Sequence, residues 1–143
     1  MSEHAVKIET RVATPDDLAF VSQDGYVPAA TMARKVAAGE VYICALDGKP
    51  IGYLRLEYLW STTPYIALIR VLEPHRRMGA GRALLAFVER ELRAAEHRRL
   101  FSSSQENEPE PQAWHRHMGF VDCGVLFGLN EDGSGEVFFK KDL

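Results

Sequence analysis

The spacing of apolar residues changes from strand-like to helical across one short glycine-containing segment. Tyr65–Leu72 is a nearly continuous apolar run, which predicts a buried strand. Gly79 and Gly81 follow, and from Gly81 to His97 the apolar residues recur with the period of an amphipathic helix. The predicted stripe consists of Leu84, Leu85, Val88, Leu92 and Ala95. A strand that passes through a glycine turn into a long helix restricts the chain to folds that pack a helix on a sheet.

The rest of the chain supplies more strands than helices. Asp47-Gly48 is typical of a two-residue hairpin turn between two strands. Other strands are predicted at Ala5–Val12, Val41–Leu46, Pro50–Trp60, Leu100–Ser104, Val121–Leu129 and Glu136–Phe139, and helices from Thr14 onward, over Pro28–Ala38 and over Gln112–Met118. Strands and helices do not alternate regularly, which argues against a Rossmann fold. We expect one α/β domain (α+β type) over residues 1–143, with a mixed, largely antiparallel sheet of about seven strands flanked by about four helices.

The amino-acid composition indicates which class of protein the chain belongs to. The 143 residues are 46% apolar and carry 17 basic and 20 acidic side chains, a net charge of −3, as in an ordinary globular domain. The sequence contains no apolar run of about 20 residues and no secretory signal pattern, so we expect a cytoplasmic protein without a membrane segment. The two cysteines, Cys44 and Cys123, do not form a disulfide framework and are expected to be reduced core residues.

Charge is distributed unevenly along the chain. Residues 70–99 hold 8 Arg against 4 Glu, whereas residues 100–143 hold 3 basic and 8 acidic side chains. A basic segment within an acidic chain indicates a local anion site and not a nucleic-acid-binding face, which is usually basic throughout. Arg76, Arg77 and Arg82 flank the glycines, so we expect them at the rim of that site.

The glycine turn has the chemistry of an anion site. The first turn of a helix offers N–H groups without helical partners and the positive end of the dipole, and Gly79 and Gly81 let the backbone approach a phosphate closely. The segment is not a Walker A loop, because no Lys-Ser/Thr pair follows Gly81, and Leu84 breaks the dinucleotide fingerprint. A turn without a ligand is the alternative interpretation.

Two motifs resemble those of the GNAT superfamily of N-acetyltransferases. The first comprises Val71, Arg76, Gly79, Gly81, Leu84 and Leu85, similar to the family's acetyl-CoA loop. The second comprises Asn107, Ala113, Trp114, His115, Gly119 and Phe120, similar to its later aromatic helix with a Gly-Phe ending. The order of elements also fits, so the resemblance spans nearly the whole chain. It implies direct transfer of an acetyl group from acetyl-CoA to a primary amine of a small molecule or peptide, without a covalent enzyme intermediate.

The resemblance also implies which residues bind acetyl-CoA. The pantetheine arm would lie in a V-shaped split between Tyr65–Leu72 and Leu100–Ser104, with Asn107 on its other side. Trp114 is expected at the cofactor or, together with Trp60 and Tyr58, at the acceptor pocket; its helical spacing equally fits a core residue. The arm and thioester would meet Ile69, Arg70 and Val71, and the pyrophosphate would meet Arg76, Arg77, Met78, Gly79, Ala80, Gly81 and Arg82.

The sequence departs from the family at the positions that would move protons. His115 stands where the family often has a Tyr that protonates the leaving thiolate. It would either donate that proton or be a partly exposed helix residue, with water as the donor. No acid lies within Tyr65–Leu72, so Glu57 and Glu73 are the candidate bases, or they are solvated carboxylates. The tyrosines that remain as substitute acids are Tyr26, Tyr53, Tyr58 and Tyr65.

Other functions stay open. A non-catalytic acyl-CoA-binding regulatory or interaction module on the same fold is the main alternative, and an acetylating toxin is a weaker one. We expect no metal, because His115 and His117 lie on different helix faces. We also expect no nucleic-acid or membrane partner and either a monomer or a homodimer. An exposed Glu136–Phe139 strand would permit pairing across a dimer.

Overall fold

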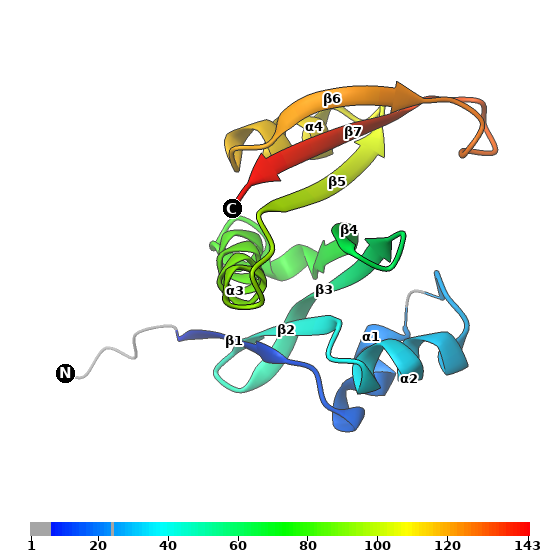
Figure 1. Ribbon diagram of the computed structural model, residues 1–143. Coiled ribbons are helices and arrows are strands. Elements are labelled where there is room, and N and C mark those ends of the chain that lie inside the picture. Colours follow the sequence, from blue (N-terminus) through cyan, green and yellow to red (C-terminus); the bar gives the residue numbers. More distant parts are fainter. Residues whose placement is uncertain (1–6, 24) are drawn as a thin grey trace. The chain divides into compact units, whose positions relative to one another are not determined.

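The computed structural model describes residues 7–23 and 25–143 (Figure 1). The strands are β1 (Ile8–Val12), β2 (Val41–Leu46), β3 (Lys49–Leu59), β4 (Thr63–Val71), β5 (Arg99–Gln105), β6 (Val121–Leu126) and β7 (Glu136–Asp142). The α-helices are α1 (Leu18–Val21), α2 (Ala29–Ala37), α3 (Ala80–Ala94) and α4 (Pro109–His117), and 3₁₀ turns cover Pro15–Asp17 and Glu73–His75.

The strands form one sheet in the order β1-β2-β3-β4-β5-β7-β6. The β1–β2, β2–β3, β5–β7 and β6–β7 pairs are antiparallel, and β4 pairs in parallel with β5, with Tyr65 opposite Phe101. For the described residues, the prediction of a mixed, largely antiparallel sheet of about seven strands with four helices is confirmed.

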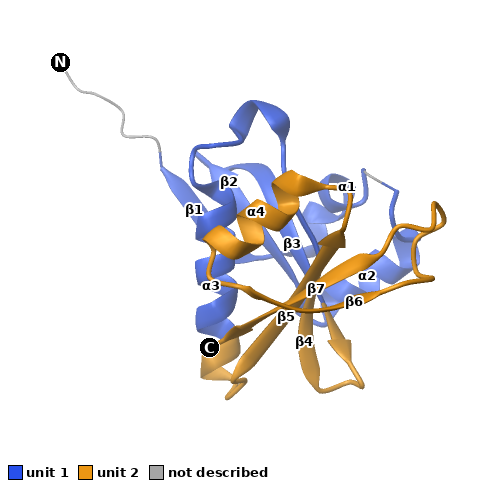
Figure 2. Ribbon diagram, turned by 90° about the horizontal axis from the view of Figure 1, so that it is seen from above, with its two compact units in different colours: residues 1–56, 68–91 blue, residues 57–67, 92–143 orange. Residues whose placement is uncertain are grey.

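The chain divides into two compact units, which Figure 2 colours separately. Unit 1 consists of residues 1–56 and 68–91. Its core gathers Val21, Met32, Ile43 and Tyr53 from α1, α2, β2 and β3. The start of its first helical segment is fixed by Asp17, whose carboxylate accepts the Thr14 N–H at 2.8 Å and pairs with Arg11 at 2.7 Å.

Unit 2 consists of residues 57–67 and 92–143. The side chains of β5 alternate between a buried face with Leu100, Ser102 and Ser104 and a half-buried face with Phe101, Ser103 and Gln105. The α4 helix covers the first face, where its residue His115 contacts Ser102. The other face of β5 carries the polar groups considered below.

Local sequence signals account for several elements. Asp47 and Gly48 both have positive φ, 48° and 83°, and join β2 to β3 as the hairpin signal predicts. The predicted stripe of α3 is also confirmed at four of its positions, because Leu84, Leu85, Val88 and Leu92 are all buried. Ala95 differs, since α3 ends at Ala94 and Ala95 is exposed.

The structure corrects several predictions about the position, exposure and bounds of the strands. The C-terminal strand is not a sheet edge, because β7 pairs with both β5 and β6. Cys44 is buried as expected, but Cys123 is exposed, since every residue of β6 is exposed. The predicted strand over Val121–Leu129 ends at Leu126. The first predicted strand begins at Ile8, and Ala5 and Val6 lie outside the described residues.

Candidate functional site

The end of β4 is held close to β3 within unit 1. A Cβ on Gly52 would lie 2.8 Å from the Arg70 carbonyl oxygen and 3.2 Å from a methyl of Val71, so only glycine fits there without a shift. The Leu72 N–H donates to the Ile51 carbonyl oxygen at 2.8 Å. These contacts fix the backbone at Ile69–Val71, which the sequence predicts to face the cofactor arm.

The loop after β4 turns sharply before the helix begins. Glu73 lies exposed in the 3₁₀ turn Glu73–His75. The Arg76 side chain folds back, and its Nε donates to the Val71 carbonyl oxygen at 3.0 Å. Arg77 and Gly79 have positive φ, 67° and 87°. Gly79 is the residue type that such a turn favours, but Arg77 in the left-handed region was not predictable from its type.

The start of α3 presents its first N–H groups at the end of this loop. The first backbone bond of the helix runs from the Ala83 N–H to the Gly79 carbonyl oxygen at 2.9 Å. The residues between them therefore form the turn that carries the positive end of the dipole and N–H groups without helical partners. Gly79 is exposed and has no atom within 4 Å of where a Cβ would stand, and Arg82 is exposed beside it. The turn is therefore exposed at Gly79 and Arg82, and the anion site predicted there stays a prediction.

The predicted site residues fall into two sets. Unit 1 holds Ile69–Val71, Glu73 and Arg76–Arg82 on β4, the loop and α3. Unit 2 holds the other four, which are Glu57, Asn107, Trp114 and His115. Within unit 2, Glu57 is half-buried near the end of β3, and Trp114 is half-buried in α4 with its ring edge-on to His115 at 5.2 Å. Asn107 is exposed, and its side chain hydrogen-bonds Asp132, a carboxyl whose pKa is lowered chiefly by hydrogen bonds from Ser134.

His115 is a buried residue with both ring nitrogens bonded. Its Nδ1 lies 2.7 Å from the Pro111 carbonyl oxygen, and its Nε2 lies 2.7 Å from the Ser102 hydroxyl. The ring stacks on Phe139 with centroids 4.6 Å apart and planes within 4°. Burial lowers the pKa of His115 below 6.5, partly opposed by the bond to Pro111.

These contacts determine which ring nitrogen of His115 carries the proton. A carbonyl oxygen only accepts, so Nδ1 carries the proton and the neutral ring accepts the Ser102 hydrogen at Nε2. The interpretation of His115 as a partly exposed helix residue is therefore wrong, because its exposed fraction is 4%. Its bonding favours a structural role in which it holds α4 on the sheet.

A polar network that the sequence did not predict lies on the other face of β5. The Tyr65 hydroxyl is 2.5 Å from the Ser103 hydroxyl, which donates to Glu136 at 2.5 Å. The Asn130 amide donates to the other oxygen of Glu136 at 3.1 Å and accepts from Gln105 at 3.4 Å. The one signal in the sequence is the serine run of β5, because hydroxyl groups within a sheet usually need hydrogen-bond partners where they are buried.

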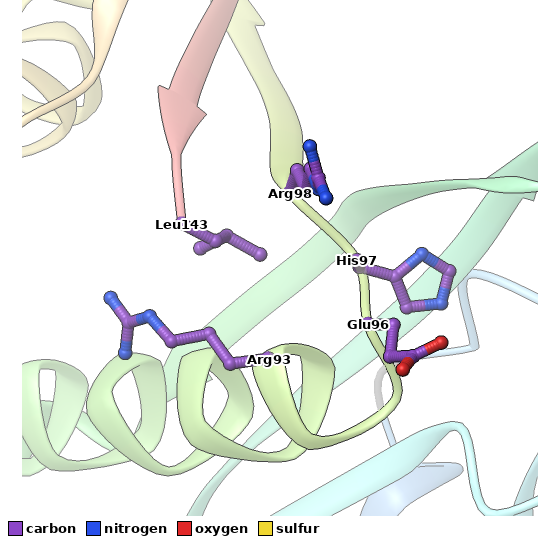
Figure 3. Close-up of a pocket in the computed structure, with 5 residues that line it drawn as sticks. All are labelled: Arg93, Glu96, His97, Arg98 and Leu143. Atoms are coloured by element: carbon purple, nitrogen blue, oxygen red, sulfur yellow. The ribbon is translucent and has the colours of Figure 1, made fainter.

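The surface hollow drawn in Figure 3 lies elsewhere. It is lined by Arg93, Glu96, His97, Arg98 and Leu143, near the end of α3 and the start of β5, and includes no predicted site residue. Within residues 7–23 and 25–143 no three His, Cys, Asp or Glu side chains are grouped to hold a metal ion. In the same part of the chain, no helix is both long and apolar enough to cross a membrane.

Solved structures share this fold at low identity. Ard1 from Thermoplasma volcanium superposes with a TM-score of 0.82 at 20% identity, covering 95% of this chain and 97% of that one. The ribosomal-protein-alanine N-acetyltransferase from Brucella melitensis gives 0.79 at 20% identity, covering 94% and 99%. yncA from Salmonella typhimurium, solved with its cofactor acetyl-CoA, gives 0.80 at 17% identity, covering 95% and 94%.

Sequence comparison identifies the family. No curated protein matches the chain significantly. The family model of the acetyltransferase (GNAT) family matches residues 10–120, which is most of the chain and includes both motifs. The chain belongs to the acetyltransferase (GNAT) family.

Proposed function

We propose that the chain is an acetyl-CoA-dependent N-acetyltransferase that transfers the acetyl group to a primary amine of a small molecule or peptide. The observation that carries the proposal is the loop from Val71 to Arg82, in which left-handed turns at Arg77 and Gly79 lead into the open N-terminus of α3. Family membership and the acetyl-CoA bound in the yncA structure support it.

The loop fits the pyrophosphate of acetyl-CoA. The leading N–H groups of α3 at Ala80 and Gly81 are the donors that a phosphate prefers at a helix N-terminus. Gly81 adds no side chain there, and Arg77 and Arg82 are exposed at the rim, where they add positive charge. The backbone of Ile69–Val71 is held next to this loop and would bind the arm. Asn107, Met78 and Trp114 are the other proposed cofactor contacts.

The bound thioester supplies an activated acetyl group. For direct transfer the amine must lose a proton, and the departing thiolate gains one. Glu73 is exposed beside the loop, and Glu57 is half-buried on β3, so both are proposed as bases that act directly or through water. The bonding of His115 supports water, and not this side chain, as the proton donor to the thiolate.

Calorimetric titration of acetyl-CoA and CoA into the purified protein tests the loop. We expect binding by the wild type and none by the Arg76→Ala, Gly81→Trp double variant, because the tryptophan fills the space above the first helical turn. Arg90→Ala is the matched control, since Arg90 is exposed on the same helix, far from its N-terminus. Equal binding by the double variant would refute the assignment, provided that thermal melting shows it to be folded.

The non-catalytic module is the second candidate, favoured by the absence of an acid on β4 and by the bonded nitrogens of His115. Thiol release with a diamine, an arylalkylamine and a short peptide with a free α-amino group decides between the two. Cys123 is exposed, so the thiol signal of the protein alone must be subtracted. Oligomeric state, a cytoplasmic location and the lack of nucleic-acid or membrane partners remain predictions.

A further inference from the structure

We propose that Tyr65, Ser103 and Glu136 form a proton path that takes the ammonium proton of the acceptor amine to the Glu136 carboxylate. The inference rests on the proposed N-acetyltransferase function and names the groups that activate its acceptor. All three residues belong to unit 2, where they lie on β4, β5 and β7.

The direction of the hydrogen bonds follows from the donors available. Ser103 has one hydroxyl hydrogen and donates it to Glu136. The Tyr65–Ser103 contact therefore uses the phenolic hydrogen, with Ser103 as acceptor. Both hydrogens thus point toward the carboxylate, and the Tyr65 oxygen keeps its lone pairs for a donor outside the network. An amine nitrogen is such a donor.

The three side chains are held in place by the sheet. Ser103 and Glu136 lie on adjacent antiparallel strands, and Ser103 is opposite Phe138. The Tyr65 ring stacks on Phe138 with centroids 6.0 Å apart and planes inclined by 29°. Asn130 fixes the second oxygen of Glu136. This network needs no rearrangement to pass a proton, because adjacent oxygens are already within 2.5 Å.

The path would serve an acceptor amine that binds in its protonated, ammonium form. Burial raises the pKa of Tyr65, so the phenol stays protonated at neutral pH and can act only by passing its proton on as it takes another. The terminal proton acceptor is Glu136, so by this path Glu136, and not Glu57 or Glu73, is the base that takes the ammonium proton.

The step balances as a proton transfer. One N–H bond of the ammonium breaks and an O–H bond forms at Tyr65, while the phenolic hydrogen moves to Ser103 and the serine hydrogen to Glu136. The products are a neutral amine and a protonated Glu136. The freed nitrogen lone pair then attacks the acetyl carbonyl.

The test compares acceptors that do and do not need to lose a proton. The probes are the panel amine with the fastest turnover and the hydrazide of the same carbon skeleton, which is already neutral at pH 7. We expect Glu136→Gln and Tyr65→Phe to lower kcat for the amine about 10²-fold and for the hydrazide less than about threefold, since general-base catalysis supplies a factor of this size. Ser103→Ala should behave in the same way.

Ser104→Ala is the matched control for Ser103→Ala. Ser104 is the next residue of β5, lies on the opposite, buried face, and its hydroxyl has no partner within the described part of the chain. Equal loss for both acceptors in the folded variants would overturn the proton path and indicate a structural network. No turnover of any amine by the wild type would instead refute the N-acetyltransferase function itself.

Discussion

At the scale of single residues, His115 shows how burial changes what a side chain can do. In a partly exposed site, a histidine would titrate near 6.5 and could donate a proton at neutral pH. Here the ring is stacked on Phe139, bonded at both nitrogens and kept neutral by burial. His115 therefore has a structural role, in which its hydrogen bonds and ring stacking hold α4 against the sheet.

This role predicts a pH dependence of stability. Because the folded-state pKa of His115 is lowered, the unfolded state binds its proton first, and stability falls as pH drops below about 6.5. We expect His115→Gln to lose about 1–3 kcal/mol of unfolding free energy at pH 7.5, from lost stacking and hydrogen bonds. Between pH 7.5 and 5.5, urea denaturation should show a smaller further loss in the variant than in the wild type.

The same variant separates the structural role from a catalytic one. Other acidic and basic groups titrate in both proteins, so the difference between the two pH slopes reports His115 alone. Parallel slopes would contradict a buried neutral ring. If the variant is as stable as the wild type but its kcat is strongly reduced, His115 acts as the proton donor to the thiolate.

At the scale of elements, the close contact of β3 with β4 positions the strand that is proposed to bind the cofactor. Gly52→Ala would place a methyl 2.8 Å from the Arg70 carbonyl oxygen, a backbone atom that can move only with its strand. We expect a loss of about 1–3 kcal/mol in unfolding free energy from this overpacking. Because Ile69–Val71 must shift, CoA affinity measured by calorimetry should fall as well.

Gly39→Ala distinguishes that effect from general destabilisation. Gly39 has a φ of 74° after α2, and its missing Cβ faces open space, so alanine there adds backbone strain without touching β4. The Gly39 variant should melt at a lower temperature and bind CoA as the wild type does. If both variants bind CoA normally, the β3–β4 contact does not control the site.

The elements that sequence could predict are those whose signals are local. Asp47-Gly48, the stripe of α3 and Gly79 each depend on neighbours a few positions away, and the structure agrees with them. The link from Tyr65 to Ser103 joins residues 38 positions apart, and that from Ser103 to Glu136 joins residues 33 apart. Such contacts depend on strand order, which no local period determines.

At the scale of the whole molecule, strand order explains the remaining errors. The chain places β7 between β5 and β6, so the C-terminal strand has two partners and β6 becomes the end of the sheet. Cys123 is exposed for that reason. The apolar composition of a strand does not say whether it lies inside a sheet or at its end.

The distribution of charge over the whole chain predicts how the affinity for CoA depends on salt concentration. A net charge of −3 would repel an anion such as CoA, so binding must depend on the local excess of arginine in residues 70–99. Arg76, Arg77 and Arg82 are exposed and therefore screened by salt. We expect CoA affinity in calorimetry to fall about 10-fold between about 0.05 and 0.5 M NaCl, as the Debye length shortens from more than 10 Å to under 5 Å.

Arg82→Ala should weaken binding at low salt and reduce the salt dependence, whereas Arg90→Ala should leave both unchanged. A salt-independent affinity would mean that the backbone N–H groups of α3 hold the phosphates without help from the arginines.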